Sequence, residues 1–223
     1  MMILSCGHHE RKRSIRREAI LAAAYELFLE KGYEATTLSD IVGRSGGSLA
    51  TLYELFEGKP GLLRSLVGDR CSQISDAIDH AVSSQKPARE ALREIAEYMF
   101  DKIIDPNAVA LFKAALAQPE LGRKLYEAGP ANGQAKVAEY LALQSKAGNL
   151  SIDDPVFAAQ TFFQMMFGHF HQQLLFGVPV TLTTADKARH FDKVMAAYFK
   201  IYGPTPPRPA TSRTARRTVK SPV

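Results

Sequence analysis

The chain of 223 residues contains no tryptophan, only two cysteines, and no stretch in which polar and apolar residues alternate. A half-buried β-strand needs such alternation, so we expect no sheet. Cys6 and Cys71 show no paired spacing, which argues against disulfides and indicates a reducing compartment. Because tryptophan is absent, a stacking surface for single-stranded nucleic acid would depend on tyrosine and phenylalanine alone. The opening sequence MMILSCGHH also lacks the apolar run of a signal peptide.

Charge is concentrated in two short segments of the chain. Lysine and arginine together exceed aspartate and glutamate by 28 to 23. Residues 11–17, RKRSIRR, and residues 203–223 each contain five basic residues and no acidic one, so the C-terminal tail alone matches the formal net charge of +5. The tail is rich in proline, serine, threonine and arginine and has little to bury, which predicts disorder. It is either a solvated extension or a segment that attracts DNA without sequence preference.

Residues 155–185 contain no charged side chain at all. About twenty apolar residues would span a bilayer, but glutamines, threonine and histidines interrupt this stretch too often for a membrane segment. A helix over 155–176 is instead expected to have one face on its own domain and the other on a second subunit. Residues 185–202 predict a similar final helix, and two such helices from each chain would form a four-helix homodimer interface. The expected interface residues are Phe163, Phe167, Phe191, Val194, Met195 and Tyr198.

Residues 36–59, TTLSDIVGRSGGSLATLYELFEGK, have the pattern of two short amphipathic helices joined by a glycine turn. Thr37 followed by Asp40 predicts a capping box at the start of the first helix, and Ser48 predicts the cap of the second. Ser45-Gly46-Gly47 between them favours a turn with positive φ. This is the pattern of a helix-turn-helix, whose second helix lies in the major groove of DNA. In that helix we expect Leu52 and Phe56 to face inward, and Leu49, Ala50, Thr51, Tyr53 and Glu54 to face outward.

A wider set of residues in fixed order surrounds this motif: Arg16, Arg17, Ile20, Ala24, Leu27, Phe28, Gly32, Tyr33, Thr37, Ile41, Gly46, Ser48, Thr51, Leu52, Tyr53, Phe56, Lys59 and Leu62. Over residues 13–63 this spacing closely resembles the N-terminal domain of the TetR/AcrR family of bacterial regulators. Gly47 stands where that family usually has an apolar residue, and Leu49-Ala50 replaces its frequent lysine-glycine pair. Residues 110–177 more loosely resemble the ligand-binding half of the AefR-like branch. The similar points there are Pro119-Glu120-Leu121, Gly129-Pro130, Gly148-Asn149-Leu150, Asp154-Pro155, Ala158-Ala159 and Gly177.

The resemblance implies contacts with double-stranded DNA from Thr37, Arg44, Ser48, Leu49, Ala50, Thr51, Tyr53 and Lys59. Thr37 and Lys59 would contact phosphates at helix starts. The hydroxyl groups on the second helix would reach phosphates or base edges, although Tyr53 also fits a packing role. Leu49-Ala50 would lie near thymine methyl groups. Ser48 is expected to be mainly a helix cap, and Arg44 is either a phosphate ligand or solvated.

Downstream of the motif, apolar residues recur with helical spacing up to residue 202. Proline and glycine dipeptides are the expected breaks, with helices over 59–79, 88–103, through 112–116, and over 121–128, 134–147, 155–176 and 185–202. This predicts an all-α fold, with a three-helix DNA-binding domain followed by a helical ligand-binding and dimerisation domain. The expected units are a flexible arm (1–10), the helix-turn-helix domain (11–58), the effector-binding and dimerisation domain (59–202) and a disordered basic tail (203–223).

The second domain also contains a cluster of large apolar and histidine side chains: Met99, Phe100, Phe112, Leu116, Phe162, Met165, Met166, His169 and Phe170. Each fits an ordinary core position, and the resemblance favours an effector pocket among them. Methionine adapts to irregular apolar shapes, and residues 162–170 carry no formal charge. We therefore expect a fairly apolar or aromatic effector with one or two hydrogen bonds, to His169, Tyr140 or Gln164.

Other patterns match catalytic or metal sites only in part. Gly43-Arg44-Ser45-Gly46-Gly47 fits the nucleophile elbow of hydrolases, but that motif follows a strand and here a helix is expected. Gly58-Lys59 lacks the earlier glycine of a phosphate loop. Residues 6–9 hold soft ligands in an expected flexible arm, and His169 and His171 lie on different faces of a helix. We expect no catalytic residue, no metal site and no cofactor.

Together these patterns predict a homodimeric, cytoplasmic and nucleoid-associated bacterial repressor with no membrane association. It would bind a near-palindromic operator, and a small-molecule effector of apolar or aromatic character would release it. One alternative is a DNA-binding regulator without an effector, which a filled second-domain core would favour. The other is a small helical enzyme using Ser45 or His169, for which no base or nucleophile partner stands at a recognisable spacing.

Overall fold

The computed structural model describes residues 4–204, with side chains described from residue 10 onward. Within that range every regular element is a helix, so the predicted all-α fold is confirmed. The elements are α1 (Leu4–Lys31), α2 (Leu38–Ser45), α3 (Leu49–Phe56), α4 (Lys59–Ser83), α5 (Ala88–Ile103), α6 (Pro106–Leu116), α7 (Pro119–Tyr126), the π turn η1 (Glu127–Ala131), α8 (Asn132–Lys146), α9 (Pro155–Phe163), the π turn η2 (Gln164–Gly168), α10 (His169–Leu175) and α11 (Thr184–Tyr202).

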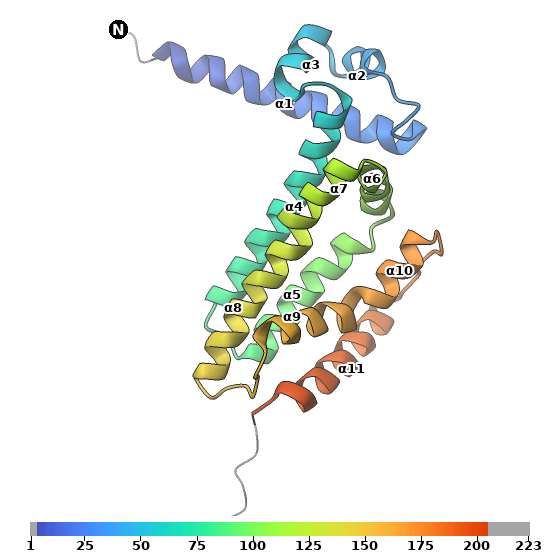
Figure 1. The fold of residues 1–223 in the computed structure, drawn as a ribbon. Helices are drawn as coiled ribbons and strands as arrows, with labels where there is room; N and C mark the ends of the chain where they lie inside the picture. The colour runs from blue at the N-terminus through green and yellow to red at the C-terminus, as the bar shows by residue number, and fades with distance from the viewer. Residues whose placement is uncertain (1–3, 205–223) are drawn as a thin grey trace, which may run out of the picture.

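One long helix, α4, joins two unequal parts of the molecule (Figure 1). The helices α1, α2 and α3 gather at one end, and α4 begins beside α3 and runs into the larger part between α5 and α8. At about 1.5 Å per residue, its 25 residues span about 37 Å. A single rigid element therefore reaches from the small part to the far end of the large one.

Two clusters of buried apolar side chains form the cores of these parts. The first core belongs to the small part, and the second core belongs to the large part. The second core lies among α4, α5, α8, α9, η2 and α11, and Phe100, Phe162 and Tyr198 are fully buried in it. The first core lies among α1–α4 and is completed by Leu111 of α6 and Leu125 of α7, together with their neighbours. The first core thus extends well beyond residue 58, because helices of the large part close it.

Both α1 and α4 are longer than the sequence predicts. Helix α1 begins at Leu4, so most of the segment 1–10, expected to be a flexible arm, is helical. Helix α4 continues to Ser83, beyond the expected end near residue 79, because Ala81 still packs into the second core. The expected disordered tail over 203–223 lies outside the described residues from 205 onward.

The expected helix break at Gly129-Pro130 is wrong. The chain continues from α7 through η1 into α8, and Pro130 lies inside the π turn. Proline removes one backbone donor and crowds the preceding turn, and a wider i→i+5 turn accommodates it without ending the helix. Gly129 allows close contact here, since a Cβ atom at this position would lie 2.9 Å from the Cys71 sulfur on α4.

The expected helix over 155–176 is present, but it also contains a π turn, η2, between α9 and α10. The carbonyl of Met166 within this turn lies 2.9 Å from Nε2 of His190 on α11. This contact joins the π turn to α11. None of the helices in the described part of the chain combines the length and apolarity that crossing a membrane requires.

Candidate nucleic-acid interface

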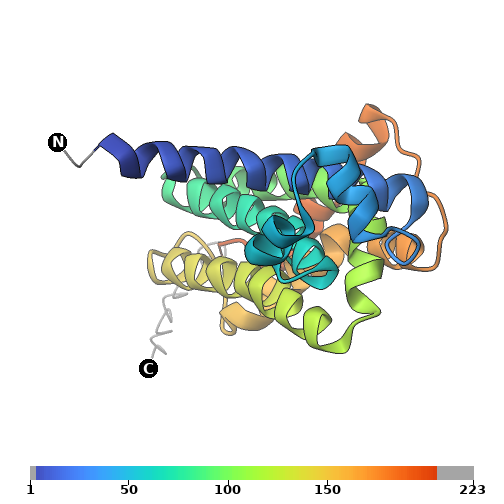
Figure 2. The same ribbon diagram turned by 90° about the horizontal axis from the view of Figure 1, so that it is seen from above.

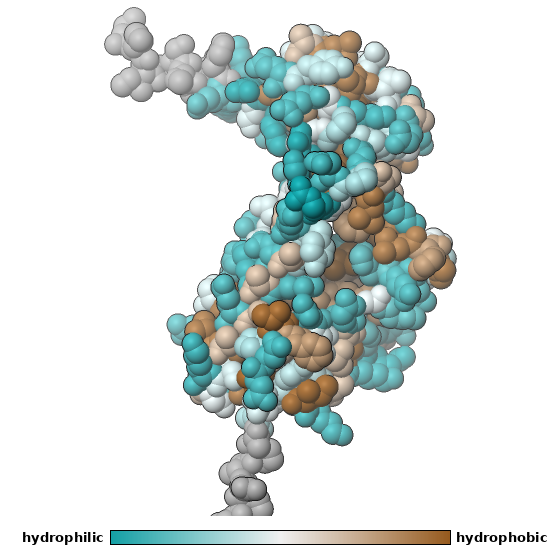
Figure 3. Space-filling view, viewed as in Figure 1, coloured by the Kyte–Doolittle hydropathy of each residue, from teal (hydrophilic) through white to brown (hydrophobic). Residues whose placement is uncertain are grey.

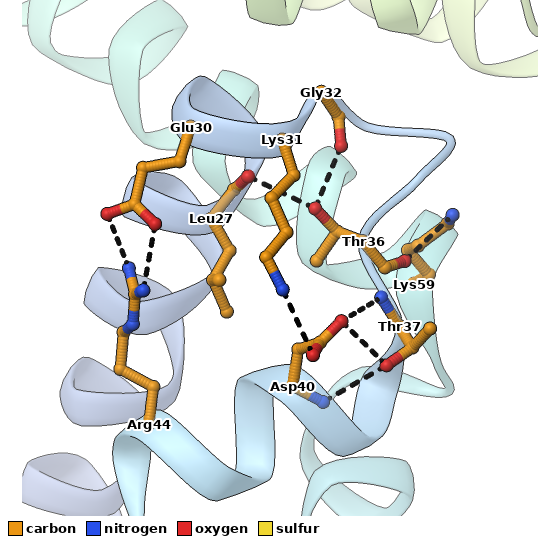
Figure 4. A network of polar contacts seen from close by, with 9 residues as sticks. All are labelled: Leu27, Glu30, Lys31, Gly32, Thr36, Thr37, Asp40, Arg44 and Lys59. Atoms are coloured by element: carbon orange, nitrogen blue, oxygen red, sulfur yellow. Dashed lines mark hydrogen bonds and ion pairs between the residues drawn. The ribbon is translucent and has the colours of Figure 1, made fainter.

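The start of α2 has the predicted capping box (Figure 4). The Thr37 hydroxyl oxygen accepts from the Asp40 backbone N–H at 3.1 Å, and the Asp40 carboxylate accepts from the Thr37 N–H at 3.0 Å. Lys31 of α1 donates to the same carboxylate at 3.2 Å. The Thr37 backbone bond, followed by its hydroxyl and Lys31, lowers the pKa of Asp40 to about 2. This exposed corner is therefore ionic and hydrogen-bonded at neutral pH.

The turn between α2 and α3 has the predicted positive φ angles, 69° at Gly46 and 112° at Gly47. Arg16 of α1 fixes this turn, because its guanidinium donates to the carbonyls of Gly46 at 3.0 Å and Ser45 at 3.4 Å. A side chain at Gly47 would be strained at this φ and would meet that guanidinium at 3.4 Å. Ser45 ends helix α2 rather than following a strand, so the nucleophile-elbow geometry is not formed.

Helix α3 is the second helix of the helix-turn-helix and is called the recognition helix below. It has the predicted cap and the predicted faces. The Ser48 hydroxyl accepts from the Thr51 N–H at 3.2 Å. Leu52 is fully buried, whereas Leu49 is 42% and Tyr53 is 54% exposed. The outward positions Ala50 and Glu54 are exposed, and Thr51 is half-buried. The helix therefore presents a mainly small, apolar and hydroxyl-bearing face to the surroundings.

The corner from α3 to α4 is closely packed. Glu57 has a left-handed φ of 62°, which ends α3, and α4 starts two residues later. A Cβ atom at Gly61 would lie only 1.6 Å from the carbonyl oxygen of Phe56. Only glycine allows this approach, so Gly61 fixes the angle at which α4 leaves the recognition helix.

The side chain of Lys59 is not placed as predicted. Its ammonium donates to the carbonyls of Tyr33 at 2.8 Å, Glu34 at 3.0 Å and Thr36 at 3.2 Å, and it lies 4.5 Å from the centre of the Tyr33 ring. An ammonium has three donors, and all three are used by carbonyls of the loop that follows α1. Figure 4 shows the bond to Thr36. Lys59 therefore ties the start of α4 to that loop, and its side chain is not free to bind a phosphate.

Arg44 is exposed, but its side chain is paired with α1. Its guanidinium forms a two-bond pair with Glu30 of α1, at 2.7 and 2.8 Å, and lies 3.5 Å from Glu26 one turn earlier. The hydrogen bond from Arg44 lowers the pKa of Glu30. Arg44 therefore fastens α2 to α1, a role that the sequence did not predict.

Basic side chains of α1 lie beside the recognition helix. A notch of about 390 Å³ is lined by Lys12, Arg13 and Arg16 from α1 and by Thr51, Glu54 and Leu55 from α3, with Glu10 at its edge. The one ion pair across it, Arg13 to Glu54, is long at 3.9 Å and exposed. Figure 2 shows α1 running past α3 as one long helix. The sequence revealed this charge but not its position, since only the fold brings it next to α3.

Six of the nine residues predicted to form an effector pocket lie together in or against the second core, and three do not. Met99, Phe100, Phe162 and Met166 are buried core residues, and Met165 and Phe170 pack against the same core. Phe112 lies apart and contacts His171, whose ring centre is 5.7 Å away. Leu116 is 46% exposed and His169 is exposed as well, so neither lines an interior site.

His190, which the sequence analysis did not single out, packs at the edge of the second core. Its ring lies 4.9 Å from Phe170 and 5.9 Å from Phe100, and its Nε2 contacts the Met166 carbonyl. His190 precedes the buried Phe191 on α11, which places it at the edge of the second core. Helical spacing did not identify it, because its partners come from η2 and α5, which only the fold brings beside α11.

The residues predicted for the dimer interface are mostly interior to one protomer. Phe167, Phe191, Val194, Met195 and Tyr198 are buried in the chain's own core, and Phe163 packs against that core. Tyr198 even donates from its hydroxyl to the Ala158 carbonyl at 3.0 Å. Different apolar residues are exposed on α9, α10 and α11 and on the segment after α10. They are Val156, Phe157, Leu175, Phe176, Val178 and Ile201.

Comparison with known families and structures agrees with this geometry. Residues 20–66 match the bacterial regulatory proteins of the tetR family, and residues 90–204 match the C-terminal domain of AefR-like transcriptional repressors. The HTH-type transcriptional regulator BetI of Escherichia coli O17:K52:H18 (strain UMN026 / ExPEC) is 30% identical over 118 residues, which are 50% of this chain and 60% of BetI. The chain thus spans less than two thirds of that relative's length.

Solved structures match over more of the chain. A structure assigned to the TetR family from Mesorhizobium loti has a TM-score of 0.76 at 26% identity, covering 86% of this chain and 98% of that one. The Flavonoid-responsive Regulator FrrA has a TM-score of 0.67 at 28% identity, with the same coverage of 86% and 98%. With its helix-turn-helix and both halves matched, the chain belongs to the TetR family of DNA-binding transcriptional regulators.

Proposed function

We propose that the protein is a homodimeric repressor that binds a near-palindromic DNA operator through α3. The observation that carries this proposal is the exposed outer face of α3, with Leu49 and Tyr53 outward on a helix whose inner face is fully buried. Large side chains exposed on a short, capped helix fit contacts with base edges and thymine methyl groups in the major groove.

The phosphate contacts are assigned to residues other than Lys59 and Arg44. Lys12 and Arg13 lie beside α3 and have no short ion pair with a described carboxylate. Thr37 is exposed at the start of α2, where backbone N–H groups favour an anion. Lys59 and Arg44 would then act by positioning the helices, and basic residues of α1 would supply the salt-dependent part of the affinity.

Selection of DNA by the purified full chain from a random pool tests this proposal directly. The expected result is enrichment of a sequence with two-fold symmetry. Replacing Arg13 by Gln should weaken binding to all sequences alike and reduce the slope of log K against log salt by about one. Tyr53→Phe and Leu49→Ala should instead change which bases are preferred. Recovery of no preferred sequence would contradict the proposal.

The proposed dimer surface is the outward face of α9, α10 and α11. One recognition helix reads only a few base pairs, and two-fold symmetry doubles the site. Figure 3 shows hydrophobic residues gathered where Figure 1 places α9 and α10, and these helices carry the exposed Phe157 and Leu175, with Phe176 directly after α10. The exposed Ala196 and Ala197 would allow α11 of two protomers to approach closely.

Sedimentation of charge variants tests this surface. Phe157→Asp should convert the dimer to monomer at micromolar concentration and abolish operator binding, because an unpaired carboxylate would be buried. Tyr126→Asp is the matched control, since Tyr126 is 56% exposed on α7 outside the proposed surface. A Phe157→Asp chain that remains dimeric would place the interface elsewhere.

Release by a small-molecule effector is part of the proposal and is supported by two comparisons. The C-terminal half matches a repressor branch, and the name of the 28% identical FrrA describes it as flavonoid-responsive. Close packing of Phe100, Phe162 and Met166 favours the alternative of a regulator without an effector. Measuring operator affinity with and without flavonoids and other aromatic compounds separates the two, since only the first predicts weaker binding.

A further inference from the structure

A groove of about 740 Å³ lies at the end of the second domain that is remote from the recognition helix. Figure 1 places the ends of α4, α8 and α11 there, on the side opposite α2 and α3. Its volume is in the range of sites for drug-sized molecules. The lining residues are Val82, Gln85, Lys86, Pro87, Ala88, Arg89, Tyr140, Gln144, Gly148, Asn149, Phe199 and Pro204. Of these residues only Tyr140 was expected to contact an effector, and none of them is acidic.

Tyr140 on α8 supplies a buried polar atom to this groove. Tyr140 is only 6% exposed, and its hydroxyl is closed to solvent and has no hydrogen-bond partner among the described residues. Burial raises the pKa of this phenol, so the hydroxyl is a neutral donor at physiological pH. A buried hydroxyl without a partner costs free energy. A polar atom of a ligand that enters beside Tyr140 would provide the missing partner.

Arg89 supplies a positive charge that no described carboxylate neutralises. Its guanidinium lies 4.4 Å from the centre of the Phe199 ring, and it forms no ion pair with a described residue. Lys86, by contrast, is paired with Glu94 at 2.5 Å. An unpaired guanidinium is well suited to a carboxylate, which it can bind through two parallel hydrogen bonds. Arg89 is thus the lining residue of the groove with an unpaired positive charge.

Apolar and amide groups complete the lining. Val82, Pro87 and Phe199 provide flat apolar surface, and the amide of Asn149 donates to Gln144 at 2.8 Å. An aromatic ring would pack on such surfaces, since aromatic pairs prefer offset-stacked or edge-to-face arrangements. The basic C-terminal tail starts near Pro204, but its charge has the same sign as that of Arg89, so it is a poor occupant.

We propose that this distal groove binds a small aromatic carboxylate, with its carboxylate on Arg89, its ring against Phe199 and a hydroxyl or similar polar group at Tyr140. Val82 in the groove and Lys59 at the DNA-binding end belong to the same helix, α4. A ligand that fixes one end of α4 can therefore change the spacing of the recognition helices. This last step rests on the proposed function, whereas binding in the groove does not.

Direct binding to the full-length protein tests the groove. We would titrate 4-hydroxycinnamate and 4-hydroxybenzoate by calorimetry, with their methyl esters as uncharged probes. Arg89→Gln should weaken binding of the acids by about 10- to 100-fold, the loss typical of one charge-assisted pair, and leave the esters unchanged. Tyr140→Phe should weaken hydroxylated acids more than cinnamate and benzoate. Arg189→Gln on α11 is the matched control, because Arg189 is exposed and does not line the groove.

The outcomes separate the groove from the proposed function. Acids that bind neither wild type nor the chain without residues 205–223 would overturn the groove proposal and leave DNA binding untouched. Acids that bind only after removal of that tail would assign the groove to the tail and equally overturn the proposal. Binding that depends on Arg89 but leaves operator affinity unchanged would support the groove and contradict effector release. Coupling of about 1–3 kcal/mol would appear as roughly 5- to 150-fold weaker operator binding.

Discussion

The two parts of the molecule are held together by different kinds of contact. Around the helix-turn-helix, charged side chains bind particular backbone carbonyls, as Arg16 does at the turn and Lys59 does at the loop after α1. In the second domain, aromatic rings pack edge to face around Phe100, whose ring lies 5.2 Å from both Phe170 and Phe191. Directional bonds fix a geometry, whereas apolar packing fills a volume.

This difference corresponds to what each part has to do. A recognition helix must be held in one position relative to DNA. The bonds from Arg16, Lys59 and Arg44 restrain the α2–α3 turn, the start of α4 and the end of α2, respectively. The second core contains methionine and phenylalanine, which repack at modest cost. The first part is therefore expected to be sensitive to single polar changes, and the second to changes in volume.

The largest expected effect is the loss of volume in the second core. Phe162→Ala should lower the free energy of unfolding by about 3–5 kcal/mol, because Phe162 is fully buried and its removal leaves a cavity. Urea denaturation would measure this, and Tyr126→Ala is the control, since Tyr126 is 56% exposed and lies outside the proposed dimer surface. If both variants were equally stable, the second domain would not be held by packing.

A smaller but more localised effect is expected at the corner between α3 and α4. Gly61→Ala places a Cβ atom against the Phe56 carbonyl, so we expect a loss of about 3 kcal/mol together with loss of operator binding. Gly68→Ala, one to two turns further along α4, has open space around it. It should stabilise the protein by up to about 1 kcal/mol, because alanine is the better helix former. Denaturation and operator binding of the two variants would be compared side by side.

Lys59→Met removes three hydrogen bonds to carbonyls but keeps the length of the side chain. We expect a loss of about 2 kcal/mol, typical of hydrogen bonds to a charged group, and weaker operator binding with an unchanged salt slope. A salt slope that falls by one would instead return Lys59 to the phosphate contacts. Denaturation and binding at several salt concentrations provide both measurements.

The smallest expected effect concerns the capping box of α2. The pKa of Asp40 is about 2 in the folded protein and lies below its ordinary value of 3.8, so its ionised form stabilises the fold. This contribution is fully present above pH 4 and is lost as the pH falls from about 4 through 2. Asp40→Asn should therefore differ from wild type in stability at pH 6 and much less at pH 2. A difference that persists undiminished at pH 2 would mean that the cap does not depend on charge.

The sequence predicted the first part more completely than the second, for physical reasons. Capping by Thr37 and Ser48 acts within three residues, so local spacing reveals it. The partners of Arg44 and Lys59 are 14 and up to 26 residues away, and only the fold brings them together. For the same reason basic charge on α1 was visible in the sequence, but its place beside α3 was not.

In the second part, helical spacing correctly identified most inward positions but not what they face. Phe191 and Tyr198 were expected to meet another subunit, yet they fill the chain's own core. A buried stripe has the same spacing whether it packs within a chain or between chains. The Gly129-Pro130 dipeptide predicts a break, and it instead forms a π turn, because packing on α4 holds the helix together across it. Local sequence carries no information about that packing.

The α9–η2–α10 segment has an outward face whose alignment depends on the number of residues in the π turn η2. Phe157 and Phe176 are 19 residues apart, which at about 100° per residue leaves them about 100° out of phase on a regular α-helix. One residue absorbed by the π turn restores five full turns, so both side chains can point outward, as observed. Deletion of one residue within 164–168 would thus rotate Phe176 away from the face on which Phe157 lies. The sequences of α9 and α10 would remain unchanged.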